Sequence, residues 1–417
     1  MIWRKINKMT KEKAKEPQIR FKGFTNAWEQ RKLGELANIV RGASPRPIQD
    51  PKWFDDESDV GWLRIADVTE QDGRIHHLEQ HISKLGQEKT RVLTEPHLLL
   101  SIAATVGKPV VNYVKTGVHD GFLIFLEPKF NRVFMFQWLE MFRPKWQKYG
   151  QPGSQVNLNS DLVKNQEIAL PREEEQQKIG AYFAKLDHLI TLHQRKCDLL
   201  RKAKKTLLQK MFPKNGETTP EIRFKGFTGA WEQCKLGEVC LEIGDGLHSA
   251  PLYDDAGKYY FINGNNLIEG KIIIDKLETP KVSNEVFEKN NSQLDNNTVL
   301  LSINGTIGNL AYYQGENVML GKSAAYLKVK NIEKKYLYTV LQTPMILRQF
   351  DLSLTGTTIK NLGLSAIKNT IVYMPIKEEQ ERIGEYFSQL DHLITLHQHE
   401  LEKLQNIKKS CLKMMFV

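Results

Sequence analysis

LDHLITLHQ occupies residues 186–194 of this chain and returns unchanged at residues 390–398. A second repeated stretch, IRFKGFT, stands at residues 19–25 and 222–228, and both copies are followed by AWEQ and KLGE segments. The copies lie 204 and 203 residues apart, so the 417 residues form two tandem halves with the same opening and the same closing element.

Both closing elements have the sequence pattern of a long helix. Between Pro171 and Pro213 the first closing element contains no proline and only one glycine, Gly180. Its acidic start and basic end suit the helix dipole. The length predicts a helix of about 40 residues, roughly 60 Å long. Apolar residues alternate at spacings of four and three, which is the coiled-coil pattern, so we expect the two helices to pair.

The predicted helix–helix seam comprises Ile179, Phe183, Leu186, Ile190, Leu200 and Leu207 in the first helix, and Ile383, Phe387, Leu390, Ile394, Leu401 and Leu404 in the second. The same register places His193, Lys204, His397 and Lys408 in the seam. Single histidines at such positions tune register or bond locally, and no second ligand stands at metal spacing, so no metal site is predicted. Packing of each helix on its own domain alone remains the alternative.

A second apolar stripe runs beside the seam. Its members would stay uncovered in a simple helix pair, which leaves a surface for the helices of a partner protein. The stripe comprises Tyr182, Leu189, Leu192, Tyr386, Leu393 and Leu396.

The middles of the halves share only a skeleton. SIAATVG at 101–107 resembles SINGTIG at 302–308, and GSQVNL at 153–158 resembles GTTIKNL at 356–362. Short β-rich runs separated by Gly and Asn predict a mixed domain with an antiparallel meander in each half. Helical patterns follow near Phe134 and Lys335, and we expect prolines 144 and 344 to end them.

The sequence therefore predicts an α+β protein with two tandem mixed domains, each followed by a long helix, and with the two helices paired. The predicted parts are a basic N-terminal extension at 1–16, a first domain at 17–170, a first helix at 171–212, a linker at 213–219, a second domain at 220–374 and a second helix at 375–417. Shared edges indicate a task that both halves perform alike, and divergent middles indicate two different targets.

The charge favours a polyanionic target. Lys and Arg number 59 against 49 Asp and Glu, a formal charge of +10. Double-stranded DNA would be read by polar side chains on rigid loops, with Lys and Arg nearby for phosphates. The candidates in the first half are Arg41, Ser44, Arg46, Arg64, Asp67, Thr105, Lys108, Ser154, Gln155 and Asn157; those in the second are Asp245, His248, Asn263, Asn265, Asn266, Asn304, Thr306, Lys322, Thr357, Thr358 and Lys360.

Catalytic motifs are missing from the sequence. GENVMLGKS at 315–323 has five residues between its glycines where a P-loop has four, and no GxSxG motif occurs. Methyl-donor and adenine-binding loops of a methyltransferase are absent as well. Four cysteines form no CxxC pair, and no apolar run is typical of a signal peptide or a membrane span, so a cytoplasmic protein without bound cofactor is predicted.

Taken together, AWEQRKLGEL and AWEQCKLGEV, the SIAATVGK and SINGTIGN turns and the LDHLITLHQ helices resemble the DNA-specificity subunits of Type I restriction-modification systems. The resemblance implies two target-recognition domains that read a split asymmetric DNA site, and an antiparallel coiled coil that sets their spacing. It also implies docking of two methyltransferase subunits and two restriction (motor-nuclease) subunits. S-adenosylmethionine would belong to the former, and ATP and magnesium to the latter.

Other classes of protein stay open at this point. A free-standing bipartite DNA-binding regulator would share the charge and the two halves without needing the second apolar stripe. A coiled-coil scaffold that binds proteins would be insensitive to salt and to added DNA, unlike a reader of phosphates. An enzyme would require a motif that the sequence does not display.

Overall fold

The fold is taken from a computed structural model, which describes residues 16–146, 148, 158–290 and 292–417. The predicted extension at 1–16 and the candidates Ser154, Gln155 and Asn157 thus lie outside the described residues, except for Glu16. The chain divides into two compact units. Unit 1 contains the chain up to His193 together with Glu400–Val417, and unit 2 contains Gln194–His399.

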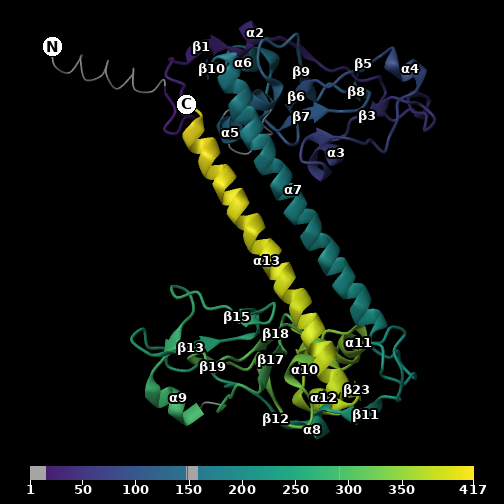
Figure 1. Ribbon diagram of the computed structural model, residues 1–417, viewed down its shortest axis with the longest axis vertical. Coiled ribbons are helices and arrows are strands. Elements are labelled where there is room, and N and C mark those ends of the chain that lie inside the picture. Colours follow the sequence, from purple (N-terminus) through teal and green to yellow (C-terminus); the bar gives the residue numbers. More distant parts are fainter. Residues whose placement is uncertain (1–15, 147, 149–157, 291) are drawn as a thin grey trace, which may run out of the picture. The chain divides into compact units, whose positions relative to one another are not determined.

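Unit 1 is built on a five-stranded sheet of order β2-β9-β6-β7-β4 and a three-stranded sheet of order β3-β8-β5 (Figure 1). The first comprises β2 (Asn38–Arg41), β9 (Phe122–Leu126), β6 (Leu98–Ser101), β7 (Pro109–Asn112) and β4 (Arg74–Ile75), and the second β3 (Gly61–Trp62), β8 (Thr116–Val118) and β5 (Arg91–Leu93). The pairs β4–β7 and β3–β8 are parallel and the others antiparallel, so the predicted meander is accurate only for part of the sheet. The helices are η2 (Pro51–Trp53), α2 (Leu33–Leu36), α3 (Ile65–Glu70), α4 (Lys84–Gln87), α5 (Arg132–Trp146) and α6 (Ser160–Lys164).

Unit 2 repeats this plan with a four-stranded sheet of order β12-β20-β17-β18 and a three-stranded sheet of order β16-β13-β19. Their strands are β12 (Cys240–Asp245), β20 (Ala324–Val329), β17 (Thr298–Ser302), β18 (Leu310–Tyr312), β16 (Lys281–Val282), β13 (Tyr259–Ile262) and β19 (Val318–Leu320). Two short pairs, β14 (Leu267–Ile268) with β15 (Lys271–Ile272) and β21 (Leu354–Thr355) with β22 (Asn361–Leu362), complete the strands around them. The short helices are η4 (Gly264–Asn266), α8 (Leu236–Val239), α9 (Asn284–Asn290), α10 (Lys334–Val340), α11 (Pro344–Leu352) and α12 (Leu364–Asn369).

The two prolines behave differently from one another. Pro344 opens the new helix α11 at its first turn, where a missing N–H costs nothing, so the expected end near it is confirmed for α10. The expectation was wrong for Pro144, because α5 continues to Trp146. Pro144 falls in the last turn of α5, so the helix loses one backbone hydrogen bond close to its end and the fully buried Trp146 still packs on the core.

The repeated opening and closing elements join each other in both units. Strand β1 (Glu29–Lys32) pairs antiparallel with β10 (Glu167–Leu170), and β11 (Glu232–Lys235) pairs in the same way with β23 (Ile371–Met374). Each pair brings the AWEQ segment of a half beside the strand that leads into its long helix. The shared edges therefore close each domain in the same manner.

The long helices are α7 (Glu173–Lys210) and α13 (Lys377–Met415), and both units show that they pair in opposite directions. In unit 1 the Phe183 ring lies 5.8 Å from that of Phe416. In unit 2 the Phe212 ring lies 6.1 Å from that of Phe387. In each unit an early residue of one helix thus meets a residue just after the end of the other helix, which confirms the antiparallel pair.

Candidate nucleic-acid interface

Three candidates of unit 1 converge on one residue, Asp120. Arg41 ends β2 and the loop after it carries Ser44 and Arg46. All three donate hydrogen bonds to Asp120 in the turn before β9. Arg41 Nε reaches the backbone oxygen at 2.6 Å, Ser44 Oγ reaches Oδ1 at 2.8 Å, and Arg46 Nη2 reaches Oδ2 at 2.7 Å. The loop is fixed to this turn because Gly42 and Ala43 donate their backbone N–H groups to Phe122 and Val118.

These contacts keep Asp120 ionised. Burial alone would raise the pKa of its carboxyl group, but the Ser44 hydrogen bond and the charges of Arg46 and Arg41 bring the pKa below its usual value. For the neighbouring His119 burial is the larger effect and lowers the pKa, so its imidazole is neutral at pH 7. The end of β2 and the loop after it therefore hold two arginines, Arg41 and Arg46, around one negative charge.

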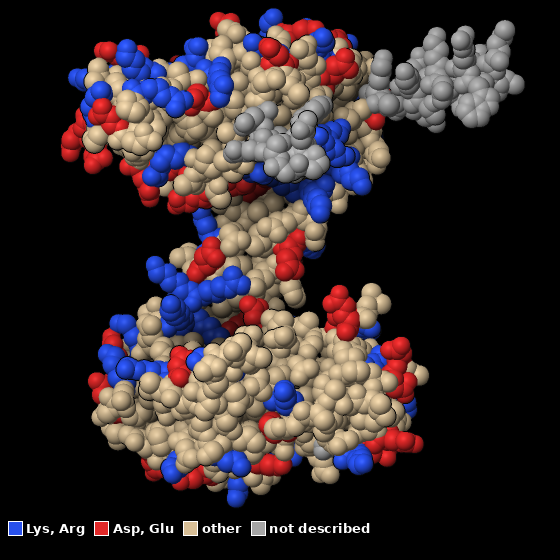
Figure 2. Space-filling model, turned by 180° about the vertical axis from the view of Figure 1, so that it is seen from behind, with Lys and Arg blue, Asp and Glu red and all other residues tan. Residues whose placement is uncertain are grey.

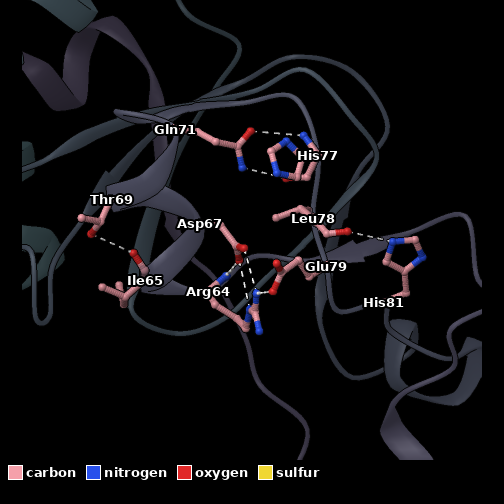
Figure 3. Close-up of polar contacts among 9 residues, drawn as sticks. All are labelled: Arg64, Ile65, Asp67, Thr69, Gln71, His77, Leu78, Glu79 and His81. Carbon is pink, nitrogen blue, oxygen red and sulfur yellow. Dashed lines mark hydrogen bonds and ion pairs between the residues drawn. The ribbon is translucent and has the colours of Figure 1, made fainter. Parts of the chain in front are cut away.

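Arg64 and Asp67 form a closed group at the start of α3 (Figure 3). The Arg64 backbone N–H donates to Asp67 Oδ2 at 2.8 Å, and its guanidinium donates to Asp67 Oδ1 at 3.0 Å and Glu79 Oε2 at 2.9 Å. These acids raise the pKa of Arg64, Asp67 more than Glu79. The carboxylate of Asp67 thus caps α3 and holds the Arg64 guanidinium, and it is itself only 2% exposed.

The TVGK turn places Thr105 and Lys108 beside α3 and α5. Thr105 Oγ1 donates to Ser101 Oγ at 3.1 Å, while Lys108 Nζ lies 2.5 Å from Asp72 Oδ1 and 2.6 Å from Glu140 Oε1. A partly open cavity of about 180 Å³ lies here, lined by Val68, Thr69, Asp72, Thr105, Lys108 and Arg143. Two carboxylates neutralise Lys108, so this turn presents little net positive charge.

Four loops of unit 2 meet at one edge of its sheet. The Lys322 backbone N–H donates to Leu247 O at 2.9 Å, and Asn304 Nδ2 donates to Lys322 O at 3.2 Å. Asn304 also forms a β-bridge with Asn361, and Gly305 N donates to Lys360 O at 3.3 Å. The loops that meet here carry the candidates His248, Asn304, Thr306, Lys322, Thr357, Thr358 and Lys360.

Other candidates of unit 2 shape the backbone. Asn266 Oδ1 accepts the Asn263 backbone N–H at 2.9 Å, and Asn263 Oδ1 accepts from Ser323 Oγ at 2.9 Å. Asp245 Oδ2 lies 2.8 Å from Nε2 of the exposed His248. Asn265, between the two other asparagines, is exposed. The side chains of Asn263 and Asn266 are thus already engaged, whereas Asn265 and His248 are accessible.

Charge alone does not outline an interface. On the face seen in Figure 2, unit 1 carries basic and acidic side chains interspersed, and unit 2 has a broad area with few charged side chains. Among the described residues, no helix has the length and apolar character needed to cross a membrane. The loops, rather than a single basic patch, therefore define the candidate interface.

Comparison with known proteins identifies the two repeats. The sequence model of the family described as Type I restriction modification DNA specificity domain matches residues 26–202 and again residues 229–406. Most of both halves, including most of each long helix, lies within these matches. The chain belongs to this family.

Relatives are similar along nearly their whole length. The specificity subunit of the Type I restriction enzyme MjaVIII from Methanocaldococcus jannaschii is 21% identical, covering 93% of this chain and 92% of that protein. The MjaIX specificity subunit of the same organism is 22% identical, covering 92% and 91%. The crystal structure of a Type I restriction-modification system S subunit from M. genitalium matches with a TM-score of 0.65 at 15% identity, covering 96% of this chain and 99% of that one, which supports the fold.

As a Type I specificity subunit, the chain recognises DNA and is not itself the catalyst. Membership in the family also implies partners with methyltransferase and restriction activity. The sequence candidates for these contacts are the exposed loop residues for DNA and the apolar stripe on the two long helices for protein.

The helix surfaces of this specificity subunit are partly covered by its own chain. Tyr182 and Tyr386 contact Phe21 and Phe224 of the IRFKGFT segments at ring distances of 5.9 and 5.6 Å. Leu189 is half-buried. The accessible part of the stripe comprises Leu192, Leu393 and Leu396, which are 50%, 42% and 47% exposed.

The seam residues fall into two environments. Ile179, Phe183, Leu186, Ile383, Phe387 and Ile394 are buried, and Ile190, Leu200, Leu207, Leu390, Leu401 and Leu404 are half-buried. Ile179, Phe183 and Leu186 belong to the same apolar cluster as the domain core of unit 1, and Ile383 and Phe387 to that of unit 2. The start of each long helix thus packs on its own domain core and against the end of the other long helix.

The seam lysines have half-buried partners that the sequence analysis missed. Lys408 Nζ lies 2.6 Å from Asp187 Oδ1, which belongs to the LDHLITLHQ segment of the other helix. Lys204 Nζ lies 2.6 Å from Asp391 Oδ1 in the second copy of that segment. The spacing of Asp and Lys in each helix, read for an antiparallel pair, contains this signal.

The IRFKGFT segments also have a purpose that sequence reasoning did not assign. Arg20 makes two hydrogen bonds of 2.7 Å to Glu175, and Arg223 makes the same pair to Glu379. Both glutamates are almost fully buried, at the first turns of α7 and α13. Each half therefore ties its opening segment to its own long helix.

Proposed function

We propose that the two units read the two halves of a split, asymmetric DNA site. The supporting observation is the meeting of four loops at one sheet edge in unit 2, with Asn304, Lys322 and Lys360 on neighbouring loops. In unit 1 the corresponding edge carries Arg41, Ser44 and Arg46 around Asp120. Two polar sets on one framework suit two different half-sites.

The candidates differ in their part in this reading. Arg41, Ser44, Arg46, Arg64, His248, Asn265, Thr306, Lys322, Thr357, Thr358 and Lys360 are assigned to DNA contact. Asp67, Asn263 and Asn266 are assigned to shaping the contact loops, because their side chains bond within the protein. Asp245, Asn304, Thr105 and Lys108 would touch DNA through whichever donor or acceptor their internal contacts leave available.

The partners in this proposal are two methyltransferase subunits and two restriction subunits, acting with this chain in the cytoplasm. S-adenosylmethionine would bind to the former, and ATP and magnesium to the latter. The exposed leucines of the helix pair support docking, because Leu192 and Leu396 occupy equivalent positions of the two repeats and so offer two like surfaces.

Co-expression with a methyltransferase subunit and long-read mapping of methylated adenines tests the proposal. One split motif with two unlike halves is the expected result. A stable complex that methylates no defined motif would contradict the assignment of sequence reading to this chain. Binding should also weaken steeply with added salt, because phosphate contacts release counterions.

A further inference from the structure

Backbone hydrogen bonds establish which residues of the two units are equivalent at their candidate DNA-contact edges, where β2 and β12 end and the turns before β9 and β20 lie. Gly42 N donates to Phe122 O in unit 1, and Gly246 N donates to Ala324 O in unit 2. Ile102 N donates to Gly121 O, and Ile303 N donates to Ser323 O. Counting one residue back from each partner makes Arg41 equivalent to Asp245, and Asp120 equivalent to Lys322.

The charges at these two equivalent positions are reversed. Unit 1 has a cation at the end of β2 and an anion before β9, and unit 2 has an anion at the end of β12 and a cation before β20. A residue required only by the fold would have the same character in both units, as Ser101 and Ser302 do at the paired strand positions. The reversal marks these positions as ones that distinguish the two targets.

Asp120 is placed to hold the side chain of Arg46 in position for contact with DNA. Its side chain is 37% exposed, and the Arg46 side chain bonded to it is 71% exposed. A bare carboxylate would repel the phosphates of DNA, but Arg41 and Arg46 give this group a net charge of +1 with Asp120 included. A guanidinium has five N–H donors, and the contact with Asp120 uses one of those of Arg46.

We propose that Asp120 is a specificity-determining positioning residue, which holds Arg46 so that its remaining N–H groups meet the acceptors of a guanine edge. Guanine O6 and N7 in the major groove form the usual partner of a bidentate arginine. Fixing the side chain before binding avoids the entropy loss of ordering a long exposed arginine. The inference rests on the proposed function, and Lys322 supplies the donor directly at the equivalent place in unit 2.

The test uses the full chain in complex with a methyltransferase subunit and compares Asp120→Ala, Asp120→Asn and Arg46→Ala. Methylated motifs are mapped by long-read sequencing, and binding is measured on duplexes with each base of the motif changed. Asp120→Ala and Arg46→Ala are expected to relax the same guanine of one half, with discrimination lowered about tenfold or more, and to leave the other half unchanged. Combining them should add little, since both remove one contact.

Controls separate positioning from folding and from the proposed function itself. The exposed Asp56→Asn serves as the matched acid control, and Lys322→Gln should alter only the other half of the motif. If wild-type protein yields a split motif that Asp120→Ala and Arg46→Ala leave unaltered, the inference is overturned and the proposed function stands. A lowered melting temperature with both halves weakened, shared by the milder Asp120→Asn, would also overturn it. Absence of any motif for wild type would overturn the proposed function.

Discussion

The two units use the same contacts where they hold themselves together and different contacts where they face a target. Arg20 with Glu175 in unit 1 repeats as Arg223 with Glu379 in unit 2, with matching hydrogen-bond lengths. At the reading edge, by contrast, arginines surround an acid in unit 1, while asparagine and lysine loops meet in unit 2. The frame of the molecule is thus separable from its recognition surface.

Exchange of a whole recognition surface should have the largest effect. Replacing residues 37–170 with those of another recognition domain should change one half of the methylated motif completely and leave the other half as it was. The physical reason is that the Arg20–Glu175 and Lys408–Asp187 contacts of unit 1 lie outside the exchanged segment. Long-read mapping decides the matter, and loss of both halves together would contradict separability.

Substitutions in the exposed part of the apolar stripe test whether Leu192 and Leu396 each belong to a docking surface for one methyltransferase subunit. Leu192→Asp or Leu396→Asp alone should lower the number of bound methyltransferase subunits from two to one, because a charge on an exposed apolar contact opposes its desolvation. The double variant should bind neither. Native mass spectrometry of the complex counts the subunits, and unchanged stoichiometry in the double variant would refute this surface.

The equivalent ion pairs Arg20–Glu175 and Arg223–Glu379 can be broken in the same way in both units. Arg20→Ala and Arg223→Ala each leave a buried glutamate without its partner, and each should cost about 3–5 kcal/mol of unfolding free energy. Denaturant unfolding of the purified chain measures both. Since the contacts match, a strong inequality between the two variants would show that the frame is not shared after all.

Replacing the seam lysine of each unit, Lys408 or Lys204, should lower the free energy of unfolding by different and smaller amounts. Asp187 also accepts hydrogen bonds from Arg74 and Gln137, so Lys408→Met leaves it partnered. Burial raises the pKa of Asp391 and the charge of Lys204 opposes this rise, so Lys204→Met should raise the pKa of Asp391 further. We expect Lys204→Met to lower the free energy of unfolding by about 1–3 kcal/mol more than Lys408→Met does at neutral pH.

The pH dependence of this loss has a definite sign. An acid whose pKa is raised by folding favours the folded state while protonated and loses that contribution as pH rises through the raised pKa. The deficit of Lys204→Met should therefore shrink as pH falls through the pKa of Asp391. Unfolding measured across the acidic range gives the check, and a deficit that grows on acidification would be the contrary result.

The sequence predicts the frame well because repeats and periodicity are local signals. The spacing of Phe183, Leu186 and Ile190 predicted a coiled-coil helix directly, and the repeat revealed its twin. Asp120 escaped notice because its partners Arg41 and Arg46 lie more than 70 residues away and meet it only through the register of β2 and β9. Asp67 was selected as a loop acid, but its capping of α3 buries it.

Met415 and Phe416 pack in the core of unit 1, where the Phe416 ring lies 5.3 Å from that of Phe134. The ribosome makes these residues after every residue of unit 2, which spans Gln194–His399. Every residue of unit 2 is therefore made before the last residues of unit 1, and unit 1, although begun first, lacks part of its core until the closing turn of α13 has been made. A frameshift near residue 410 would therefore remove core residues of the first recognition domain and leave every residue of the second unchanged.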